Sequence, residues 1–122
     1  MTTVAGNGNQ CLNSQIPCSG QNALDIPLAS PWDIVSDSDG NQLFIAMAGI
    51  HQIWKYDLET KIMNLVAGSG KEENRNNSYP LKSGFAQPSG LTLFDGNLYI
   101  ADSESSTIRI FHPKVCTMSS SF

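Results

Sequence analysis

Long hydrophobic runs are absent from this sequence of 122 residues, and no stretch approaches the roughly 20 apolar residues needed to span a bilayer. The opening residues, MTTVAGNGNQ, lack both the charged segment and the apolar segment of a secretory signal peptide. We therefore expect a cytoplasmic protein of the cytosol that has no membrane partner.

Basic residues are also few. Seven Lys and Arg stand against eleven Asp and Glu, for a net charge of -4, and the basic residues are scattered along the chain. A nucleic-acid surface needs clustered Lys and Arg to neutralise phosphates, so nucleic acid is not an expected partner. With 40% hydrophobic and 15% charged residues, the composition indicates a folded chain rather than a disordered one.

Cysteine occurs only at Cys11, Cys18 and Cys116. An odd count without a secretory signal favours free thiols in a reducing compartment, with a Cys11–Cys18 bridge as the alternative. Neither this pair nor Cys116 with His112 has the spacing of a zinc site. The sequence therefore predicts no metal and no other cofactor.

A repeat is the main feature that the sequence does contain. Three blocks recur in the same order, at offsets of 57 residues for the prolines, 55 for the leucines and 62 for the VAG turns. The recurring pairs are SPWDIV (30–35) with QPSGLTL (87–93), LFIAMAGIHQIWKYDL (43–58) with LYIADSESSTIRIFHP (98–113), and VAGNG (4–8) with VAGSG (66–70). A period of this size is typical of stacked repeat architectures.

Each repeat has the pattern of short β-strands. Ten Gly and six Pro supply turns, and the hairpin signal Asp-Gly-Asn occurs once in each unit. The strands expected from apolar runs and alternation are 34–35, 43–46, 52–58 and 62–67 in the first unit, and 91–93, 98–101 and 107–111 in the second. No helix is expected. Short antiparallel strands joined by tight turns predict an all-β fold of propeller blades, with four strands in a blade.

The second unit, PSGLTLFDGNLYIADSESSTIRIF, resembles the NHL repeat along its whole length. It has the Pro-x-Gly-hydrophobic opening, the Asp-Gly-Asn turn, a strand ending in Ala-Asp and a hydrophobic-Arg-hydrophobic strand. The first unit departs from this pattern, because Trp32 and Asp33 replace Ser-Gly and Met47 stands where the second unit has Asp102. The resemblance covers roughly residues 4–110, and it implies a non-catalytic β-propeller scaffold that binds protein partners.

The resemblance also predicts how the chain is organised. Residues 1–27 are expected to be the end of a preceding blade, with its last strand at 3–5, plus a connecting loop. The remaining parts are a first repeat (28–70), an inter-blade loop (71–87), an incomplete second repeat (88–113) and a divergent tail (114–122). We interpret the chain as a fragment, two four-stranded blades of a larger propeller for which six blades are expected. Because about three or more stacked repeats are usually needed for stability, marginal stability, aggregation or dependence on a partner is expected of two blades.

The stretch LVAGSGKEENRNN (65–77) invites comparison with a phosphate-binding loop, which would require Gly at position 65 and Ser or Thr at position 72. Leu65 and Glu72 occupy those positions, so the glycines are predicted to form a strand-ending turn and no small-molecule ligand is expected. The polar loop that follows is the candidate contact surface for a protein partner, with a solvated connection as the alternative. Its residues are Glu72, Glu73, Asn74, Arg75, Asn76 and Asn77.

Other polar residues are predicted to have structural roles. Asp102 and Glu104 offer oxygen ligands, but the first repeat has no equivalent carboxylates, so they are expected to cap their turn. His51 and His112 have no nucleophile or carboxylate at motif spacing, which favours a structural or surface role for both.

Three large side chains within the strands complete the prediction. Trp32 and Trp54 are expected to fill the space between blades, and Arg109 is expected to form an ion pair at a blade edge.

Two alternatives to a scaffold stay open. Some NHL-type propellers resemble zinc lyases, to which only His51 could contribute here, and others resemble RNA-binding NHL domains, which use a basic face.

Overall fold

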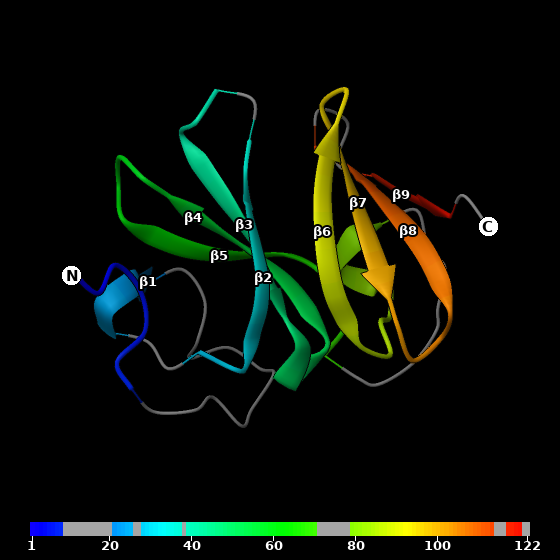
Figure 1. The fold of residues 1–122 in the computed structure, drawn as a ribbon, viewed down its shortest axis with the longest axis horizontal. Coiled ribbons are helices and arrows are strands. Elements are labelled where there is room, and N and C mark those ends of the chain that lie inside the picture. Colours follow the sequence, from blue (N-terminus) through cyan, green and yellow to red (C-terminus); the bar gives the residue numbers. More distant parts are fainter. Residues whose placement is uncertain (9–20, 26–27, 38, 71–78, 114–116, 121–122) are drawn as a thin grey trace.

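Two antiparallel β-sheets face each other in the computed structural model (Figure 1). The structure describes residues 1–8, 21–25, 28–37, 39–70, 79–113 and 117–120. Within these ranges there is no α-helix, and the only helical elements are the short 3-10 turns η1 (Ala23–Asp25), η2 (Ala48–Ile50) and η3 (Pro80–Lys82). No helix in the described part of the chain is long and apolar enough to cross a membrane.

The first sheet has the strand order β1-β5-β4-β3-β2. Its strands are β1 (Gln21–Asn22), β2 (Pro31–Ser36), β3 (Gln42–Met47), β4 (Gln52–Asp57) and β5 (Ile62–Ala67). The second sheet has the order β6-β7-β8-β9. Its strands are β6 (Pro88–Phe94), β7 (Asn97–Asp102), β8 (Thr107–His112) and β9 (Thr117–Ser120). Each sheet is therefore a meander in which strands consecutive in sequence pair with one another, apart from the added β1.

The structure differs from the sequence-based expectation at the outer edge of both sheets. Residues 3–5 do not form a strand, and the strand that pairs with β5 is β1, where Gln21 faces Met63. In the second unit, β9 pairs with β8 as a fourth strand, although only three strands were expected there. Both outer strands are short and largely polar, which explains why hydrophobic alternation did not reveal them.

Tight turns connect the strands where the Asp-Gly-Asn signals predicted them. Gly40 and Gly96 adopt φ angles of 73° and 79°, in the left-handed region that glycine occupies without a steric cost. The turn between β4 and β5 is held by Asp57, whose Oδ1 accepts the backbone N–H groups of Glu59 and Thr60, both at 2.9 Å. These hydrogen bonds favour the charged form and lower the pKa of Asp57 below its ordinary value.

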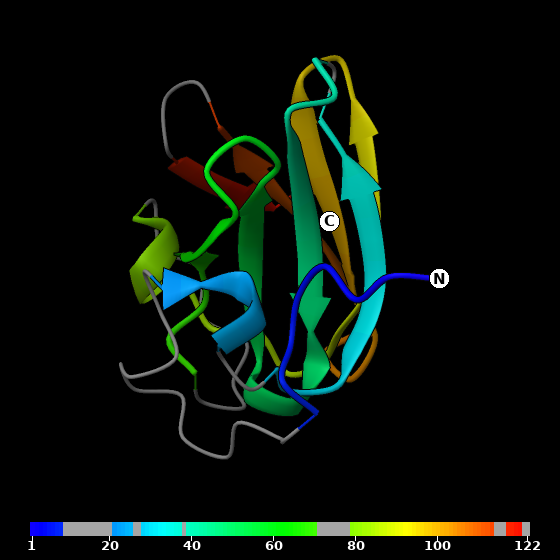
Figure 2. The ribbon, with the colours of Figure 1, turned by 90° about the vertical axis from the view of Figure 1, so that its left-hand side faces the viewer.

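Side-chain alternation divides the apolar residues of the first sheet between two clusters. In β3, Phe44 and Ala46 join the cluster between the two sheets, whereas Ile45 and Met47 join a cluster on the opposite side of the same sheet. Figure 2 shows β2 and β6 along one edge of the molecule, with the 3-10 turns η1 and η3 along the other. Strands β2 and β6 also contact each other directly. This is the arrangement of consecutive propeller blades, with β2 and β6 as the adjacent innermost strands.

Candidate functional site

The two sheets are joined by a buried apolar layer, which we call the blade junction. Phe44 in the first sheet and Phe111 in the second meet edge to face, with ring centroids 6.2 Å apart and an interplanar angle of 71°. The other buried members are Ala46, Ile53, Ala67, Phe85, Leu91, Leu98, Ile100 and Met118. The junction is therefore a hydrophobic core shared by both sheets, and neither sheet buries this surface alone.

A carboxylate crosses the junction at the innermost strands. Asp33 Oδ2 in β2 accepts the backbone N–H of Leu91 in β6 at 2.7 Å, while Asp33 Oδ1 accepts the N–H of Ile34 at 2.9 Å. The equivalent position of the second repeat is Gly90, which has no side chain. The departure of the first repeat from the NHL pattern at Asp33 thus has a structural role, because it satisfies a backbone donor of the next sheet.

His51 makes a second link between the sheets. It lies between η2 and β4 with φ at 57°, and its Nδ1 is 2.7 Å from the carbonyl oxygen of Ala86, just before β6. Since a carbonyl oxygen only accepts, Nδ1 carries the hydrogen in this contact. His51 therefore has the structural role that the sequence predicted.

Asp102 fixes the entry into β6 and is completely buried. Its Oδ1 accepts the N–H of Gln87 at 2.6 Å, and its Oδ2 accepts the N–H of Ala86 at 2.9 Å. The prediction that this carboxylate caps its own turn was wrong, because its partners lie 15 and 16 residues earlier in the chain. Ser105 takes the local role, since its Oγ donates to the carbonyl oxygen of Asp102 at 3.3 Å.

Arg109 lies in β8, and its side chain is on the buried side of the second sheet. The prediction that it forms an ion pair at a blade edge was therefore wrong. It is completely buried, its Nη1 donates to the carbonyl oxygen of Gly84 at 2.8 Å, and its guanidinium lies 5.2 Å from the centre of the Phe85 ring. Burial lowers the pKa of Arg109, and the nearby charge of Asp102 opposes that shift. The group stays a cation at neutral pH and supports the connection that leads into β6.

The glycine turns of both VAG motifs have the same geometry. Gly6 and Gly68 adopt φ angles of 90° and 103°, and their N–H groups donate to the first residues of η1 and η3, Ala23 at 2.7 Å and Pro80 at 3.0 Å. These amides donate to the chain itself, so they are not free to bind a phosphate. The VAGSG turn follows the end of β5, as predicted, whereas no strand precedes the VAGNG turn. The loop residues 72–77, predicted to contact a partner, lie outside the described residues.

The open side of the first sheet, which we call the first open face, exposes two large apolar residues of β2. Trp32 is 54% exposed and Ile34 is 55% exposed. They line a hollow of about 310 Å³ together with Val4, Ala5, Leu28, Pro31, Asp33 and Ile45. Figure 2 shows the N-terminal segment crossing this side of the sheet. The apolar residues of β3, β4 and β5 on this side are already buried or half-buried, so the exposed part lies at β2. Trp54 is buried, but it belongs to the cluster on the side of the first sheet that faces away from the blade junction. The prediction that Trp32 and Trp54 fill the space between the two blades was therefore wrong.

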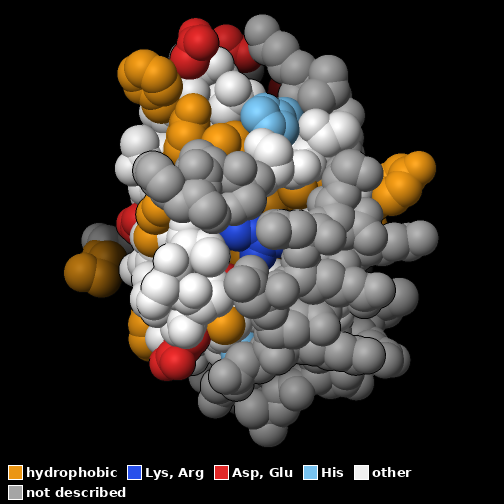
Figure 3. Space-filling model, turned by 90° about the vertical axis from the view of Figure 1, so that its right-hand side faces the viewer, with side chains coloured by type: hydrophobic (Ala, Val, Ile, Leu, Met, Phe, Trp, Pro, Cys, Tyr) orange, Lys and Arg blue, Asp and Glu red, His pale blue; other side chains and the backbone are white. Residues whose placement is uncertain are grey.

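The outer side of the second sheet, the second open face, is also apolar. Phe94 is 68% exposed and packs edge to face against Tyr99, with ring centroids 6.4 Å apart. Ala101 and Ile110 on the same side are half-buried. Figure 3 views the side of the molecule on which β8 and β9 lie, and hydrophobic side chains are visible there between polar atoms. Both ends of the two-sheet stack therefore present apolar surface.

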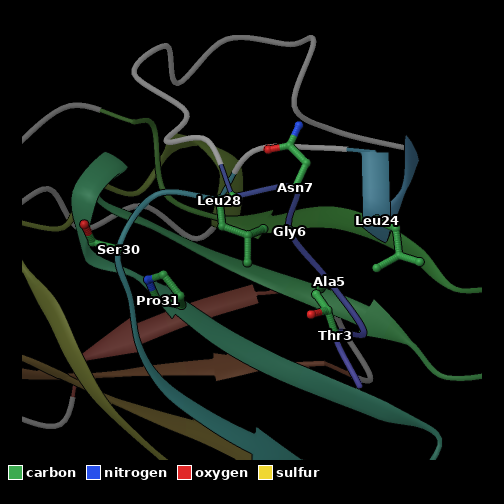
Figure 4. Close-up of a pocket in the computed structure, with 9 residues that line it drawn as sticks. Thr3, Ala5, Gly6, Asn7, Leu24, Leu28, Ser30 and Pro31 are labelled. Carbon is green, nitrogen blue, oxygen red and sulfur yellow. The ribbon is translucent and has the colours of Figure 1, made fainter. Parts of the chain in front are cut away.

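A wider hollow of about 850 Å³ lies beside the first open face (Figure 4). Its lining residues are Thr3, Ala5, Gly6, Asn7, Gly8, Leu24, Leu28, Ser30 and Pro31. None of these described residues carries a charge or a nucleophile paired with a base. The hollow offers shape and apolar contact but no groups for acid–base chemistry.

Groups that could bind a metal are dispersed in the described part of the chain, where no cluster of three His, Cys, Asp or Glu residues occurs. His112 bridges neighbouring strands, since its Nδ1 lies 3.1 Å from Asn97 Oδ1 and its Nε2 lies 2.9 Å from Ser119 Oγ. Both histidines are therefore engaged in contacts that hold strands and connections in place.

Known proteins have similar sequences. Residues 85–111 match the family model of the NHL repeat. The chain is 44% identical to NHL repeat-containing protein 2 of Gallus gallus over 93% of its own length, and 44% identical to the protein of that name from Homo sapiens over 89%. It is also 44% identical, over 88% of its length, to Protein SUPPRESSOR OF QUENCHING 1, chloroplastic, of Arabidopsis thaliana. The chain spans 18% of the length of the two animal proteins and 10% of the plant protein.

A solved structure shares the fold. It is the crystal structure of a structural genomics protein of unknown function from Bacteroides thetaiotaomicron, with a TM-score of 0.62 over 71% of this chain and 22% of that one, at 18% identity. Together with the two antiparallel sheets, these findings confirm the predicted all-β fold of NHL-type β-propeller blades. The chain contains an NHL repeat and is related, over about nine-tenths of its length, to NHL repeat-containing protein 2.

Proposed function

We propose that this chain is a non-catalytic β-propeller segment that acts in the cytosol by binding other proteins. The observation that carries the proposal is the exposure of Trp32, Ile34 and Phe94 on the open faces of the two sheets. Contiguous exposed apolar patches mark interaction sites, and aromatic side chains are enriched at the centres of protein interfaces.

The use of the buried and half-buried polar groups supports the non-catalytic part of the proposal. Asp33, Asp102 and Arg109 are each bound to backbone atoms, and His51 is bound to a carbonyl oxygen. A nucleophile or general base must be able to reach a substrate, whereas these groups hold two connections and two strands in place. Their arrangement favours a rigid scaffold over an active site.

Site-specific photo-crosslinking in the cytosol tests the proposal. We expect a benzoylphenylalanine introduced at Trp32 to form adducts with other proteins, because this side chain lies on the first open face. The matched control places the same group at Leu58, which is 43% exposed in the turn between β4 and β5 and belongs to neither open face. Equal adduct yields at the two positions would contradict the proposal, as would stoichiometric zinc in the purified chain.

A further inference from the structure

We propose that a hollow between the two sheets, which we call the rim cleft, binds a peptide segment of a partner protein that sets a carboxylate on Lys55 and an apolar side chain against Phe44 and Phe111. This inference deepens the scaffold function proposed above and rests on it, because it gives the chemistry of one partner segment. It does not involve the two open faces.

The rim cleft lies where the two blades meet and has a volume of about 260 Å³. Phe44 of the first sheet and Phe111 of the second both line it, and their rings are in edge-to-face contact. Val66 in β5 and Leu81 in η3 add further apolar surface. Among the described residues that line the cleft, only Lys55 carries a charge. The cleft therefore combines apolar walls with a single cation.

The position of Lys55 in β4 directs its side chain toward the second blade. Ile53 and Lys55 are two positions apart, so they lie on the same side of the sheet, and Ile53 is completely buried in the blade junction. Lys55 is half-buried there, and no carboxylate in the part of the chain that the structure describes forms an ion pair with it. The equivalent residue of the second repeat, 55 positions later, is Ile110. The first repeat thus has a cation where the second has an apolar side chain.

The carboxylates that lie nearest in the sequence are engaged in their own turns. Asp57 accepts two backbone N–H groups of the turn between β4 and β5, both at 2.9 Å. Asp37 accepts two backbone N–H groups of the turn between β2 and β3, at 3.0 and 3.3 Å. Asp37 and Asp39 line a neighbouring hollow of about 160 Å³ and not the rim cleft itself. The ammonium group of Lys55 is therefore available to a carboxylate from outside the chain, and the apolar walls strengthen that attraction.

The size of the rim cleft favours a peptide over a larger organic ligand. Pockets for drug-sized molecules usually measure about 300–1,000 Å³, so the cleft is small for one but suits a single large apolar side chain. Leu81 is 55% exposed at the cleft, which gives a peptide apolar surface to cover outside it. The net charge of -4 provides no general attraction for an acidic segment, so binding has to depend on the local cation.

NMR titration of the full chain with capped dipeptides tests the proposal. The probes are acetyl-Glu-Phe-amide and acetyl-Phe-Glu-amide, each compared with the same peptide carrying Gln in place of Glu. We expect at least one Glu peptide to shift the amide signals of Lys55, Val66 and Leu81. It should bind about 3- to 10-fold more tightly than its Gln counterpart, because a hydrogen bond between two charged groups is stronger than one to a neutral amide.

Two matched variants separate the charge of the cleft from charge in general. Lys55→Gln should abolish the preference for Glu over Gln. Lys61→Gln removes the same charge from an exposed position outside the cleft and should preserve that preference. Leu81→Ala should weaken both peptides by the same factor, since it removes apolar surface only. The amide spectra of the variants check that each of them keeps the fold.

Three results would overturn the proposal. The first is equal affinity for the Glu and Gln peptides of both sequences, and the second is a Lys55→Gln variant that keeps the preference. The third is tighter binding of octanoate than of either Glu peptide, which would assign the rim cleft to a fatty-acid ligand. Crosslinks from Trp32 to other proteins in the cytosol would leave the scaffold function standing in each of these cases.

Discussion

At the scale of single residues, the two repeats differ in the carboxylate that accepts hydrogen bonds from backbone N–H groups. Asp33 binds a backbone N–H of the next sheet, whereas Asp102 binds two backbone N–H groups that precede its own sheet. The repeat pattern assigned Asp33 to the first unit and Asp102 to the second. It could not show that Asp33 accepts a hydrogen bond from a residue 58 positions later, because such a contact leaves no trace in the local sequence. For the same reason, the burial of Arg109 beneath the connection at Gly84 could not be predicted from its neighbours Ile108 and Ile110.

Replacing the buried carboxylate should destabilise the fold. Asp102→Asn removes the charge that faces Arg109 and presents an amide group to a backbone donor, so we expect a loss of about 2–4 kcal/mol in the free energy of unfolding. Urea denaturation of the full chain measures this loss. The control is Glu104→Gln in the same turn, where the side chain is exposed and the midpoint should be unchanged. An equal effect of the two substitutions would contradict the role given to Asp102.

The glycine of the VAGSG turn provides a second prediction. At Gly68 a Cβ would lie 2.6 Å from the carbonyl oxygen of His51 and 2.9 Å from Gln52 Cα. Gly40 also has a positive φ, but nothing lies within 4 Å of its Cβ position. We expect Gly40→Ala to cost about 1–2 kcal/mol through backbone strain alone, and Gly68→Ala to cost clearly more because backbone atoms obstruct the methyl group. Thermal denaturation compares them, and similar costs would contradict the close packing of this turn.

At the scale of the elements, most strands could be predicted because hydrophobic alternation and the Asp-Gly-Asn turns coincide. Strand β5 occupies the predicted residues, and β4 ends one residue before the predicted end. The outer strands could not be predicted in this way. Strand β1 has two residues and β9 reads TMSS, so neither carries an alternating apolar pattern, and pairing with β5 and β8 specifies them.

The fourth strand of the second sheet can be tested through equivalent methionines. Met63 in β5 and Met118 in β9 are buried to 0% and 7% exposure, and they lie 55 residues apart. Because both fill core positions, we expect Met63→Ala and Met118→Ala each to cost about 2–5 kcal/mol in the free energy of unfolding. Chemical denaturation of the two variants measures this. A large effect at Met63 with none at Met118 would show that β9 does not complete the second sheet.

At the scale of the whole molecule, the repeat explains both what is buried and what is left open. One junction is formed between the two sheets, while Ile34 and Phe94 stay exposed on the sides of the sheets that face away from it. The sequence predicted the blades and the need for neighbours, since stacked repeats bury their faces against each other. It did not identify the exposed side chains, because Trp32 and Ile34 have the same apolar character as residues of a buried strand.

The two sheets are consecutive blades joined through their innermost strands, and hydrogen exchange at a single amide tests this arrangement most directly. The N–H of Leu91 is bound to Asp33 across the junction at 2.7 Å. We predict that this amide is protected in the full chain and that Asp33→Ala increases its exchange rate by roughly 10- to 100-fold, while the amide of Tyr56 inside the first sheet is unaffected. A Leu91 amide that exchanges at the same rate with and without Asp33 would contradict this arrangement of the two blades.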